Sequence, residues 1–563
     1  MSDSSDNDCA VLANIGSRRT GDAEAVRGAA AHETTHLAKE PLARSDPEEY
    51  FRRVRALYAG SGAVILGNIM EWYDWTIYGS MEDLIADIFM GGRHEATWLV
   101  FAVPFVARPL GSLVLGWVGD RCGRTVALNI AIWGMAMSTC LQGCIPNGMP
   151  GAAGVLAGLR FISGISAGGE AAGVNTYMTE VGGAERDYTL AAAVGVNNVS
   201  GSMAFFLATF VSLMVHQLPR TEQLAWAWRL PFLAAAPIGI ASVLLRRRMH
   251  ETEAFEAVKA ARLKAGEVRM ARESDSPSTV DDGNLTLTIS SGSGEEETSS
   301  SSAGIGNGAD STVIAPIQNA PVKEPSCVEA ENLAKSSWRE NSFSIGLAVV
   351  VLAAINSINY FPLYLVRWLQ ASCGFSAFDA LLVAGLCKIV QLFMTLPVSF
   401  LGDRLGLTKT MLFGGALSTL SMFPALFLVL AVAGHEDEVS GDAASAPVGE
   451  TPEPTAAAYA VAFVVLVGWL PIPMSLYSIL SPLYLTSMFP ANFRGRGAGV
   501  GLGLASLAGG FTPAICSILA NHEAWLPGIF VTVLAIPSMS VIAWTRHAAA
   551  RGSLRVHQRP WLF

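Results

Sequence analysis

Two carboxylates lie three residues apart within an apolar stretch, Glu71 and Asp74 in the segment GNIMEWYDWTIYG. Residues three or four positions apart share a helix face, so Asn68 would join them in one polar stripe. An acid inside a membrane span costs a few kcal/mol or more unless it faces protein or water, so a functional role is the first hypothesis. Burial and a nearby cation act in opposite directions on a carboxyl group, and an acid between them can load and release a proton. We predict that Asp74 and Glu71 handle protons; a fixed salt bridge between helices is the alternative.

Two arginines also fall inside apolar stretches, Arg108 in FVARPLGS and Arg160 in GLRFISG. Glu170 follows Arg160 by close to three helical turns, so the two roughly share a face. A buried charge without a partner is very unfavourable, and the planar guanidinium suits a carboxylate. We predict that Arg108 and Arg160 exchange an acid of the protein for a substrate carboxylate, and that Glu170 is a third proton-handling acid. Permanent structural pairs are the alternative.

The second half of the chain carries a weaker polar pattern. Asn356, Asn359 and Tyr360 share a helix face in AINSINYFPLYL, and Lys388 shares one with Gln391. Lys388 could contact an anionic substrate, pair with an acid of the first half or extend to the membrane interface. The predicted substrate-binding residues are Asn68, Arg108, Arg160, Asn356, Asn359, Tyr360, Lys388 and Gln391.

Composition identifies the class of protein that must position these side chains. Of 563 residues, 51% are hydrophobic and 15% charged, whereas soluble proteins are about 25% charged. The net charge of −10 argues against a nucleic-acid partner. The eight cysteines include no C-x-x-C pair, so we predict neither a zinc site nor a disulfide framework. We also expect no cofactor and no other metal site. The N-terminus lacks the apolar core of a signal peptide, so insertion would rely on the first span.

A helix needs roughly 20 apolar residues to cross a bilayer. By this rule we predict an all-α membrane protein with twelve spans in two halves of six. The predicted spans are 59–90, 97–118, 125–146, 152–180, 190–214, 226–246, 342–368, 377–401, 410–433, 457–489, 495–520 and 525–546.

The segments outside the spans are polar. We predict a disordered N-terminal tail (1–48), a first half (49–248), a disordered low-complexity linker (249–338), a second half (339–547) and a C-terminal tail (548–563).

Positive charges set the expected orientation, because short cytoplasmic loops are enriched in Lys and Arg. One side would carry Arg52, Arg53, Arg55, Arg121, Arg124, Arg186, Arg246, Arg247, Arg248, Arg404, Lys409, Arg494 and Arg496, and the other only Arg93, Arg220, Arg229 and Arg367. Both termini and the linker are therefore expected in the cytoplasm. The plasma membrane is the default location.

A loop motif occurs twice. GWVGDRCGRT follows the second predicted span and SFLGDRLGLTK follows the eighth. Such internal repeats are a signature of secondary transporters, which bind substrate near the midplane between related halves. The motif residues that we predict to act in gating at the cytoplasmic end are Gly116, Asp120, Arg121, Gly123, Arg124, Asp403 and Arg404. The second copy is degraded, since Ser399 replaces a glycine and Leu407 stands where the first copy has Arg124.

This motif resembles the hallmark loop of the major facilitator superfamily, and further stretches are similar to its metabolite:proton symporters, which include porters for proline and betaine, 2-oxoglutarate, shikimate and citrate. The matching stretches are GNIMEWYDWTIYG, FVARPLGSLVLGWVGDRCGR, RFISGISAGGEAAG, WAWRLPFLAAAPIGIASVLLRRRMHETEAF, LPVSFLGDRLG and SPLYLTSMFPANFRGRGAG. The resemblance implies twelve spans with pseudo-two-fold symmetry. It also implies symport of protons with a small carboxylate-bearing or zwitterionic metabolite by alternating access. We expect a functional monomer whose partners are the metabolite, protons and the lipid bilayer.

Rival functions follow from the same residues. No G-x-x-x-x-G-K-[ST] loop occurs, so direct coupling to ATP is not expected. A facilitative uniporter would leave the buried acids structural, and a non-transporting sensor would use 249–338 to recruit partners. An enzyme is not expected. The H-E-x-x-H letters occur once, at 32–36, within the predicted disordered tail. The G-x-S-x-G letters at 164–168 lie within an apolar helix rather than a strand–turn–helix. Gly164 and Gly168 instead predict close helix packing.

Overall fold

The protein is described from a computed structural model, which covers residues 42–122, 124–184, 189–246, 338–434, 454–490, 493–554 and 556. All of these residues belong to one structural unit. They form helices and connecting turns, with no strand among them. Most of the predicted tail 1–48 and of the predicted linker 249–338 lies outside the described residues.

The helices of the first half run from α2 to α12. Their bounds are α2 Leu42–Ser45, α3 Pro47–Gly60, α4 Gly62–Ser80, α5 Glu82–Phe89, α6 His94–Cys122, α7 Arg124–Gly143, α8 Ala152–Ala184, α9 Leu190–His216, α10 Arg220–Glu222, the π-helical turn η1 Gln223–Ala227, α11 Arg229–Leu233 and α12 Ala235–Arg246.

The helices of the second half run from α15 to α22. Their bounds are α15 Trp338–Cys373, α16 Ala377–Leu405, α17 Leu407–Gly434, α18 Ala456–Ala462, the π-helical turn η2 Phe463–Trp469, α19 Pro471–Ser478, α20 Ser481–Ser487, α21 Arg494–Ala520 and α22 Leu526–Ala550.

Eleven helical stretches of the described chain are long and apolar enough to cross a membrane, one for each predicted span from the second to the twelfth. The first predicted span, 59–90, is instead divided into α4 and α5 by a turn at Met81. The stretch that holds Asn68, Glu71 and Asp74 is therefore not among these eleven. The predicted all-helical membrane fold is confirmed.

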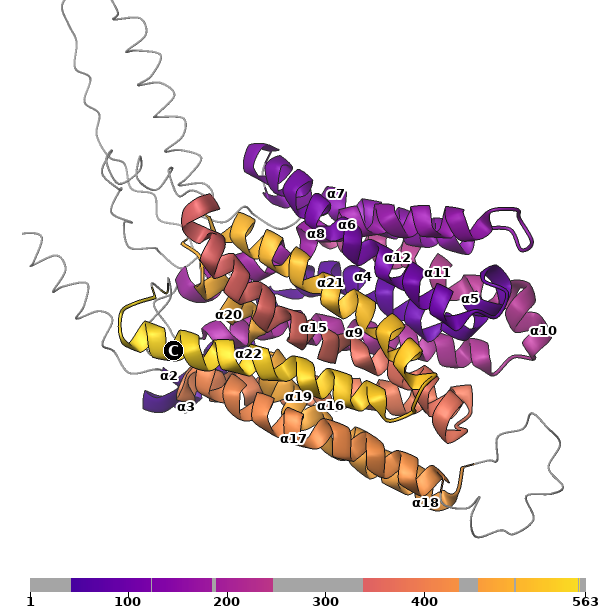
Figure 1. The fold of residues 1–563 in the computed structure, drawn as a ribbon. Helices are drawn as coiled ribbons and strands as arrows, with labels where there is room; N and C mark the ends of the chain where they lie inside the picture. The colour runs from indigo at the N-terminus through magenta and orange to yellow at the C-terminus, as the bar shows by residue number, and fades with distance from the viewer. Residues whose placement is uncertain are drawn as a thin grey trace, which may run out of the picture. The chain divides into compact units, whose positions relative to one another are not determined.

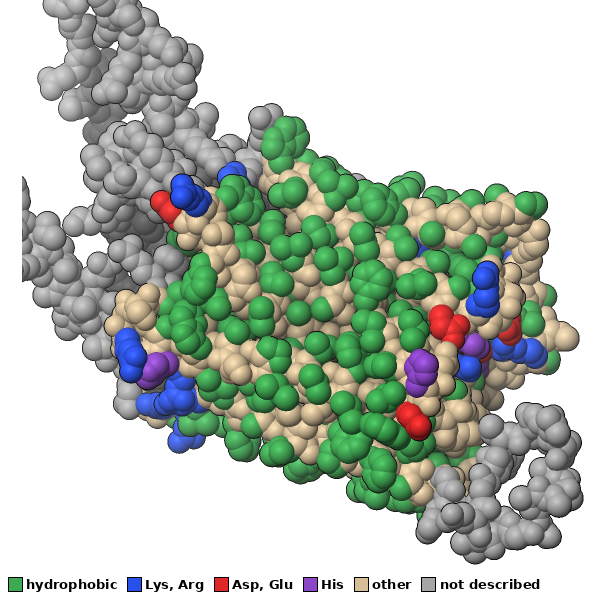
Figure 2. Space-filling model, viewed as in Figure 1, with side chains coloured by type: hydrophobic (Ala, Val, Ile, Leu, Met, Phe, Trp, Pro, Cys, Tyr) green, Lys and Arg blue, Asp and Glu red, His purple; other side chains and the backbone are tan. Residues whose placement is uncertain are grey.

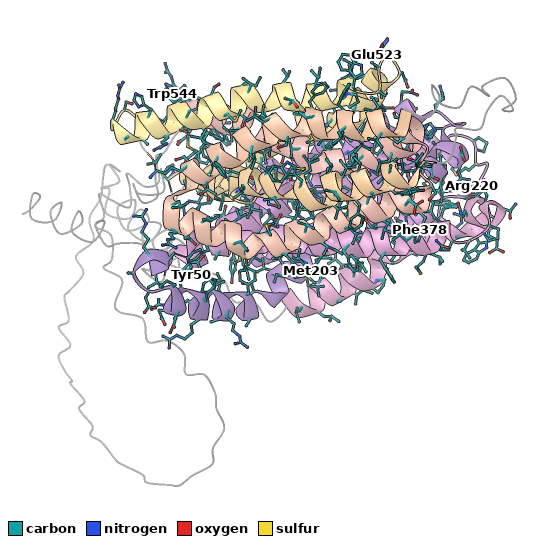
Figure 3. The ribbon with its side chains drawn as sticks, turned by 90° about the horizontal axis from the view of Figure 1, so that it is seen from below. Tyr50, Met203, Arg220, Phe378, Glu523 and Trp544 are labelled. Atoms are coloured by element: carbon teal, nitrogen blue, oxygen red, sulfur yellow. The ribbon has the colours of Figure 1, made fainter. Side chains whose placement is uncertain are left out.

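The two ends of the helix bundle differ. Figure 1 shows α2, α3 and the end of α22 at one end, here the α3 end, and α5, α10 and α18 at the other, here the α5 end. In Figure 3, Tyr50 and Trp544 mark the α3 end, while Arg220, Phe378 and Glu523 mark the α5 end. Hydrophobic side chains cover the middle of the visible face, and charged ones gather towards the two ends (Figure 2). This distribution suits a bundle surrounded by lipid, where an exposed apolar band meets the hydrocarbon.

Close backbone contact fixes α6 against α8. A Cβ atom at Gly164 would lie 2.2 Å from the carbonyl oxygen of Pro104, and one at Gly168 would lie 2.3 Å from that of Arg108. No larger residue fits these positions, so the predicted role of both glycines in packing is confirmed. The consequence for function is that Arg108 stands on a rigid helix pair.

Helix α3 precedes the first span and starts with a well-formed cap. Asp46 accepts a hydrogen bond from the backbone N–H of Glu49 at 3.0 Å, and Pro47 occupies the first turn. An N-cap acid and an N-terminal proline both favour a helix start. Tyr50 and Val54 are its buried residues. The described residues start with α2 at Leu42, within the predicted tail 1–48.

Candidate functional site

A cavity of about 70 Å³ lies between the two halves of the bundle. It receives side chains from α4, α6, α8 and α9 on one side and from α15, α16, α19, α20 and α21 on the other. Six of the predicted site residues line it, namely Glu71, Arg108, Asn356, Asn359, Tyr360 and Lys388. The other residues that the sequence predicts for proton handling or substrate binding do not line it; they are Asn68, Asp74, Arg160, Glu170 and Gln391.

Glu71 and Arg108 form a buried ion pair at the wall of this cavity. The Arg108 guanidinium donates to Oε1 of Glu71 at 2.6 Å, and the two side chains are 4% and 1% exposed. The same guanidinium lies 4.3 Å from the ring centroid of Trp75 and 5.1 Å from that of Phe105. Arg108 Nε has no hydrogen-bond partner among the described residues. The pair therefore combines a strong charge-assisted bond with an unused donor beside the cavity.

Asp74 and Arg160 form a second buried pair, one helical turn along α4, that does not reach the cavity. Nη1 of Arg160 lies 3.2 Å from Oδ2 of Asp74, and the hydroxyl groups of Ser163 and Thr139 also donate to this carboxylate. The guanidinium lies 4.4 Å from the ring centroid of Tyr78. Asp74 is thus held by three donors from two neighbouring helices. Glu170 is also buried, on α8.

Lys388 enters the cavity from the second half. Its Nζ donates to Oε1 of Gln391 at 2.8 Å and lies 5.4 Å from the ring centroid of Phe205. Gln391 does not line the cavity itself, but its hydrogen bond positions the Lys388 ammonium at the cavity wall. No carboxylate lies within ion-pair distance of Lys388 in the described part of the chain.

Asparagines of the first half complete the wall, and the sequence analysis did not select them. Asn175, Asn197 and Asn198 line the cavity. Asn68 donates to Oδ1 of Asn197 at 2.6 Å, and Asn198 donates to Oγ1 of Thr395 at 2.6 Å. The available signal was the pair of adjacent asparagines within the apolar span of α9.

The α3 end of the bundle is closed by a buried carboxylate of the repeated motif. Asp403 accepts hydrogen bonds from the backbone N–H groups of Ala191 (3.0 Å) and Ala192 (3.3 Å), at the start of α9, and from the hydroxyl of Tyr50 (3.0 Å). A helix N-terminus favours a carboxylate through its free N–H groups and its dipole. Burial and the neighbouring Asp403 raise the pKa of the Tyr50 phenol, so it remains a donor. Asp403 therefore ties α16 of the second half to α9 and α3 of the first.

The other motif residues are less informative. The backbone oxygen of Arg404 accepts from Nε of Arg44 at 2.6 Å, while the Arg404 side chain is exposed. Gly116 faces open space. Gly123 lies outside the described residues, as do the side chains of Asp120, Arg121 and Arg124.

We expect Tyr50→Phe to loosen this closure. A hydrogen bond to a charged group contributes about 1.5–3 kcal/mol, so losing one of three donors should favour opening at the α3 end. The readout is the rate at which a single cysteine, introduced by Ser112→Cys, is alkylated in a variant without the eight native cysteines. Ser112 is chosen because it lies where the halves meet: its Oγ donates to the backbone oxygen of Gly499 at 3.3 Å. Alkylation should become faster in Tyr50→Phe.

Tyr58→Phe is the matched control for this test. Tyr58 also lies on α3, but its hydroxyl has no hydrogen-bond partner among the described residues. Equal alkylation rates in the two variants would contradict a role for the Tyr50–Asp403 bond in closure.

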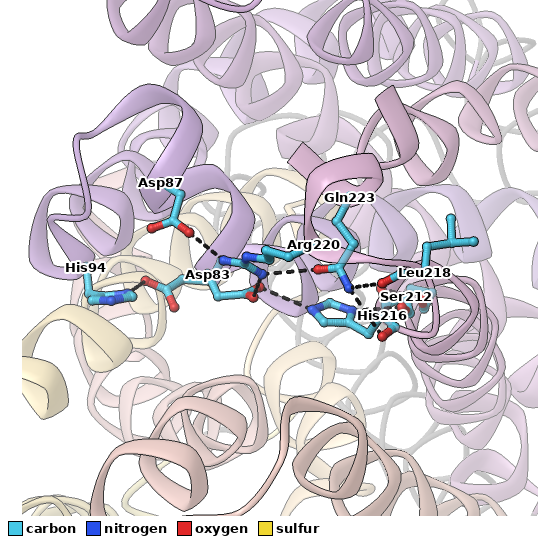
Figure 4. Close-up of polar contacts among 10 residues, drawn as sticks. Asp83, Asp87, His94, Ser212, His216, Leu218, Arg220 and Gln223 are labelled. Carbon is cyan, nitrogen blue, oxygen red and sulfur yellow. Dashed lines mark hydrogen bonds and ion pairs between the residues drawn. The ribbon is translucent and has the colours of Figure 1, made fainter. Parts of the chain in front are cut away.

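The α5 end carries a polar network within the first half (Figure 4). Arg220 pairs with Asp83 at 2.9 Å and with Asp87, while Asp83 also contacts His216 at 3.3 Å. These contacts fasten α5 to α9 and α10. The two halves meet at this end through the amide of Asn521, which donates to Glu95 at 2.8 Å. Contacts between the halves thus exist at both ends, with the cavity between them.

Comparisons with known proteins agree with this architecture. The Major Facilitator Superfamily family model matches residues 64–513. The ectoine/proline transporter ProP of Corynebacterium glutamicum is 27% identical over 500 residues, covering 85% of this chain and 81% of that protein. The proline/betaine transporter of Escherichia coli K12 is 32% identical over 205 residues, covering 34% of this chain and 40% of that protein.

Solved structures show the same fold. The proton:xylose symporter XylE, bound to 6-bromo-6-deoxy-D-glucose, superposes with a TM-score of 0.60 at 13% identity, covering 87% of this chain and 95% of that chain. The resemblance seen in the sequence is confirmed, as is the expectation of a transporter rather than an enzyme. With a family match across most of its length and two bundles of helices around a central cavity, the chain belongs to the major facilitator superfamily.

Proposed function

We propose that the protein is a proton-coupled symporter of a small carboxylate-bearing or zwitterionic metabolite and works by alternating access. The observation that carries this proposal is the Glu71–Arg108 pair, because it is an acid–base pair buried at the wall of a cavity between the halves. The proposed orientation places the α3 end in the cytoplasm of a cell whose plasma membrane holds the protein.

The pair couples proton and substrate through the cost of leaving a buried charge alone. With Glu71 ionised, Arg108 is already neutralised and has little affinity for a second anion. When Glu71 takes up a proton, Arg108 loses its partner, and a substrate carboxylate can replace it. Protonated Glu71 without substrate and ionised Glu71 with substrate are both unfavourable. Proton and substrate therefore bind together.

The relatives support this proposal. The named transporters of ectoine, proline and betaine act on molecules with a carboxylate, and XylE is named as a proton symporter. The contacts at the two ends would break in turn: Asp403 with α9 at the α3 end, and Glu95 with Asn521 at the α5 end. We propose that Asn68, Asn356, Asn359 and Tyr360 shape the substrate site between them.

Uptake into proteoliposomes tests the function. A proton gradient, acid outside, should drive accumulation of a radiolabelled small carboxylate or zwitterion, with proline and cyclopentanecarboxylate as probes. A protonophore should abolish accumulation. Equilibration that the protonophore leaves unchanged would instead show a uniporter, and a protein that moves neither probe nor protons would fit the sensor hypothesis.

A further inference from the structure

The cavity has a positive charge balance. Of the described residues that line it, one is an acid, Glu71, and two are cations, Arg108 and Lys388. The fully ionised wall carries a net charge of about +1, and protonation of Glu71 would raise it to about +2. A substrate with excess negative charge would lower the electrostatic energy of this buried region in both states.

Lys388 is the source of the excess positive charge of the cavity wall. Arg108 is balanced by Glu71, whereas the contacts of Lys388 are the neutral amide of Gln391 and the ring of Phe205. A buried ammonium without a counterion is unfavourable. The position of Lys388, at the wall opposite Arg108 in the other half, makes it a ready partner for a carboxylate of the substrate.

The aromatic rings of the cavity do not form a cage for a quaternary ammonium. Recognition of such a cation needs open ring faces. Trp75 is covered by the Arg108 guanidinium at 4.3 Å and by Trp72 at 4.6 Å. Trp72 in turn packs on Gly201, where a Cβ atom would lie 3.0 Å from its ring.

The remaining rings are also occupied. Phe205 lies beneath Lys388, and Tyr360 packs against Trp75 and Phe105 with centroid distances of 5.0 and 4.9 Å. Protein cations thus already lie against two of the rings, Trp75 and Phe205, that a betaine headgroup would use. A substrate ammonium would also approach Arg108 and Lys388, and like charges in a desolvated site cost several kcal/mol.

The neutral polar groups of the wall suit an anion. Asn356 faces the cavity, and its side-chain N–H₂ has no partner among the described residues. An amide donor beside Lys388 and Arg108 can satisfy a further oxygen of a carboxylate.

We propose that this cavity selects small carboxylates with net negative charge over zwitterions that carry an ammonium group. The inference rests on the proposed function, because it names the substrate class of the same site. Lys388 attracts the substrate carboxylate whether Glu71 is ionised or protonated, and Arg108 joins in binding that carboxylate only when Glu71 is protonated. The relatives named for proline, betaine and ectoine would then differ from this protein in substrate charge.

Isosteric pairs of probes test the selection by charge alone. The carbon analogue of glycine betaine is 3,3-dimethylbutanoate, and that of proline is cyclopentanecarboxylate. Each analogue keeps the shape and the carboxylate but lacks the positive charge. Binding to the purified full-length protein is measured by quenching of tryptophan fluorescence, since Trp72 and Trp75 line the cavity. Each monoanion should bind at least about tenfold more tightly than its zwitterionic partner.

Variants link the preference to the lysine. Lys388→Gln should remove most of the preference, and Lys388→Arg should retain it. Lys409→Gln, on an exposed lysine of α17, is the matched control and should behave as wild type. A zwitterion that binds as tightly as its analogue, or the absence of binding by both monoanions, would overturn the proposed selection. If the selection fails in this way but proline or betaine is still taken up in response to a proton gradient, the proposed symport function is retained and only the substrate preference is wrong.

Discussion

Glu71→Gln is expected to abolish proton-driven accumulation while exchange of substrate across the membrane continues. The glutamine keeps the size of the side chain but has no proton to release. Arg108 then loses its ionic partner permanently, so its guanidinium is available to a substrate carboxylate in every state. Uphill uptake should fall by about 100-fold or more, the scale on which removing a proton-transferring group acts.

The measurement separates coupling from binding. Proteoliposomes are loaded with unlabelled substrate, and entry of labelled substrate is followed with and without a proton gradient. In Glu71→Gln, labelled substrate should enter at the same rate with and without the gradient, whichever way the gradient points. Glu222→Gln is the control, because Glu222 is an exposed acid of α10 that does not line the cavity. Gradient-driven uptake at the wild-type level in Glu71→Gln would refute the coupling role of this pair.

The sequence predicted that the buried acids and arginines would pair, but it did not predict which acid would meet which arginine. The reason is physical. Helical spacing predicts that Glu71 and Asp74 share a face of α4, but which arginine pairs with each acid depends on how the neighbouring helices cross α4. The one-turn offset brings Arg108 of α6 to Glu71 and Arg160 of α8 to Asp74. Only the first pair lines the cavity.

Tertiary context also explains the residues that sequence reasoning missed. Asn197 and Asn198 were not selected because two adjacent amides in an apolar span do not reveal whether they face lipid, another helix or a cavity. Tyr50 was assigned to a region outside the spans, although the Asp46–Pro47 start signals a helix. Its contact with Asp403 joins segments more than 300 residues apart. No local pattern reports such a contact.

Asp74→Asn is expected to destabilise the folded protein far more than it affects coupling. It leaves the guanidinium of Arg160, which is 0% exposed, without a carboxylate. Removing one partner of a buried ion pair costs about 3–5 kcal/mol, because the remaining charge is desolvated and uncompensated. The apparent Tm in detergent should therefore fall clearly below that of the wild type.

A double variant separates the two possible roles of this second pair. Asp74→Asn combined with Arg160→Gln removes both charges, and much of the lost stability should return because no isolated charge remains. Proton-driven uptake in the double variant should then approach the wild-type level, since Glu71 and Arg108 are intact. If Asp74 handles the coupled proton, as the sequence alone predicted, the double variant would be stable but unable to accumulate substrate. The two hypotheses therefore predict opposite results for this double variant: accumulation of substrate near the wild-type level, or no accumulation. Stability and uptake measured together therefore decide whether one or both acids of α4 move with the proton.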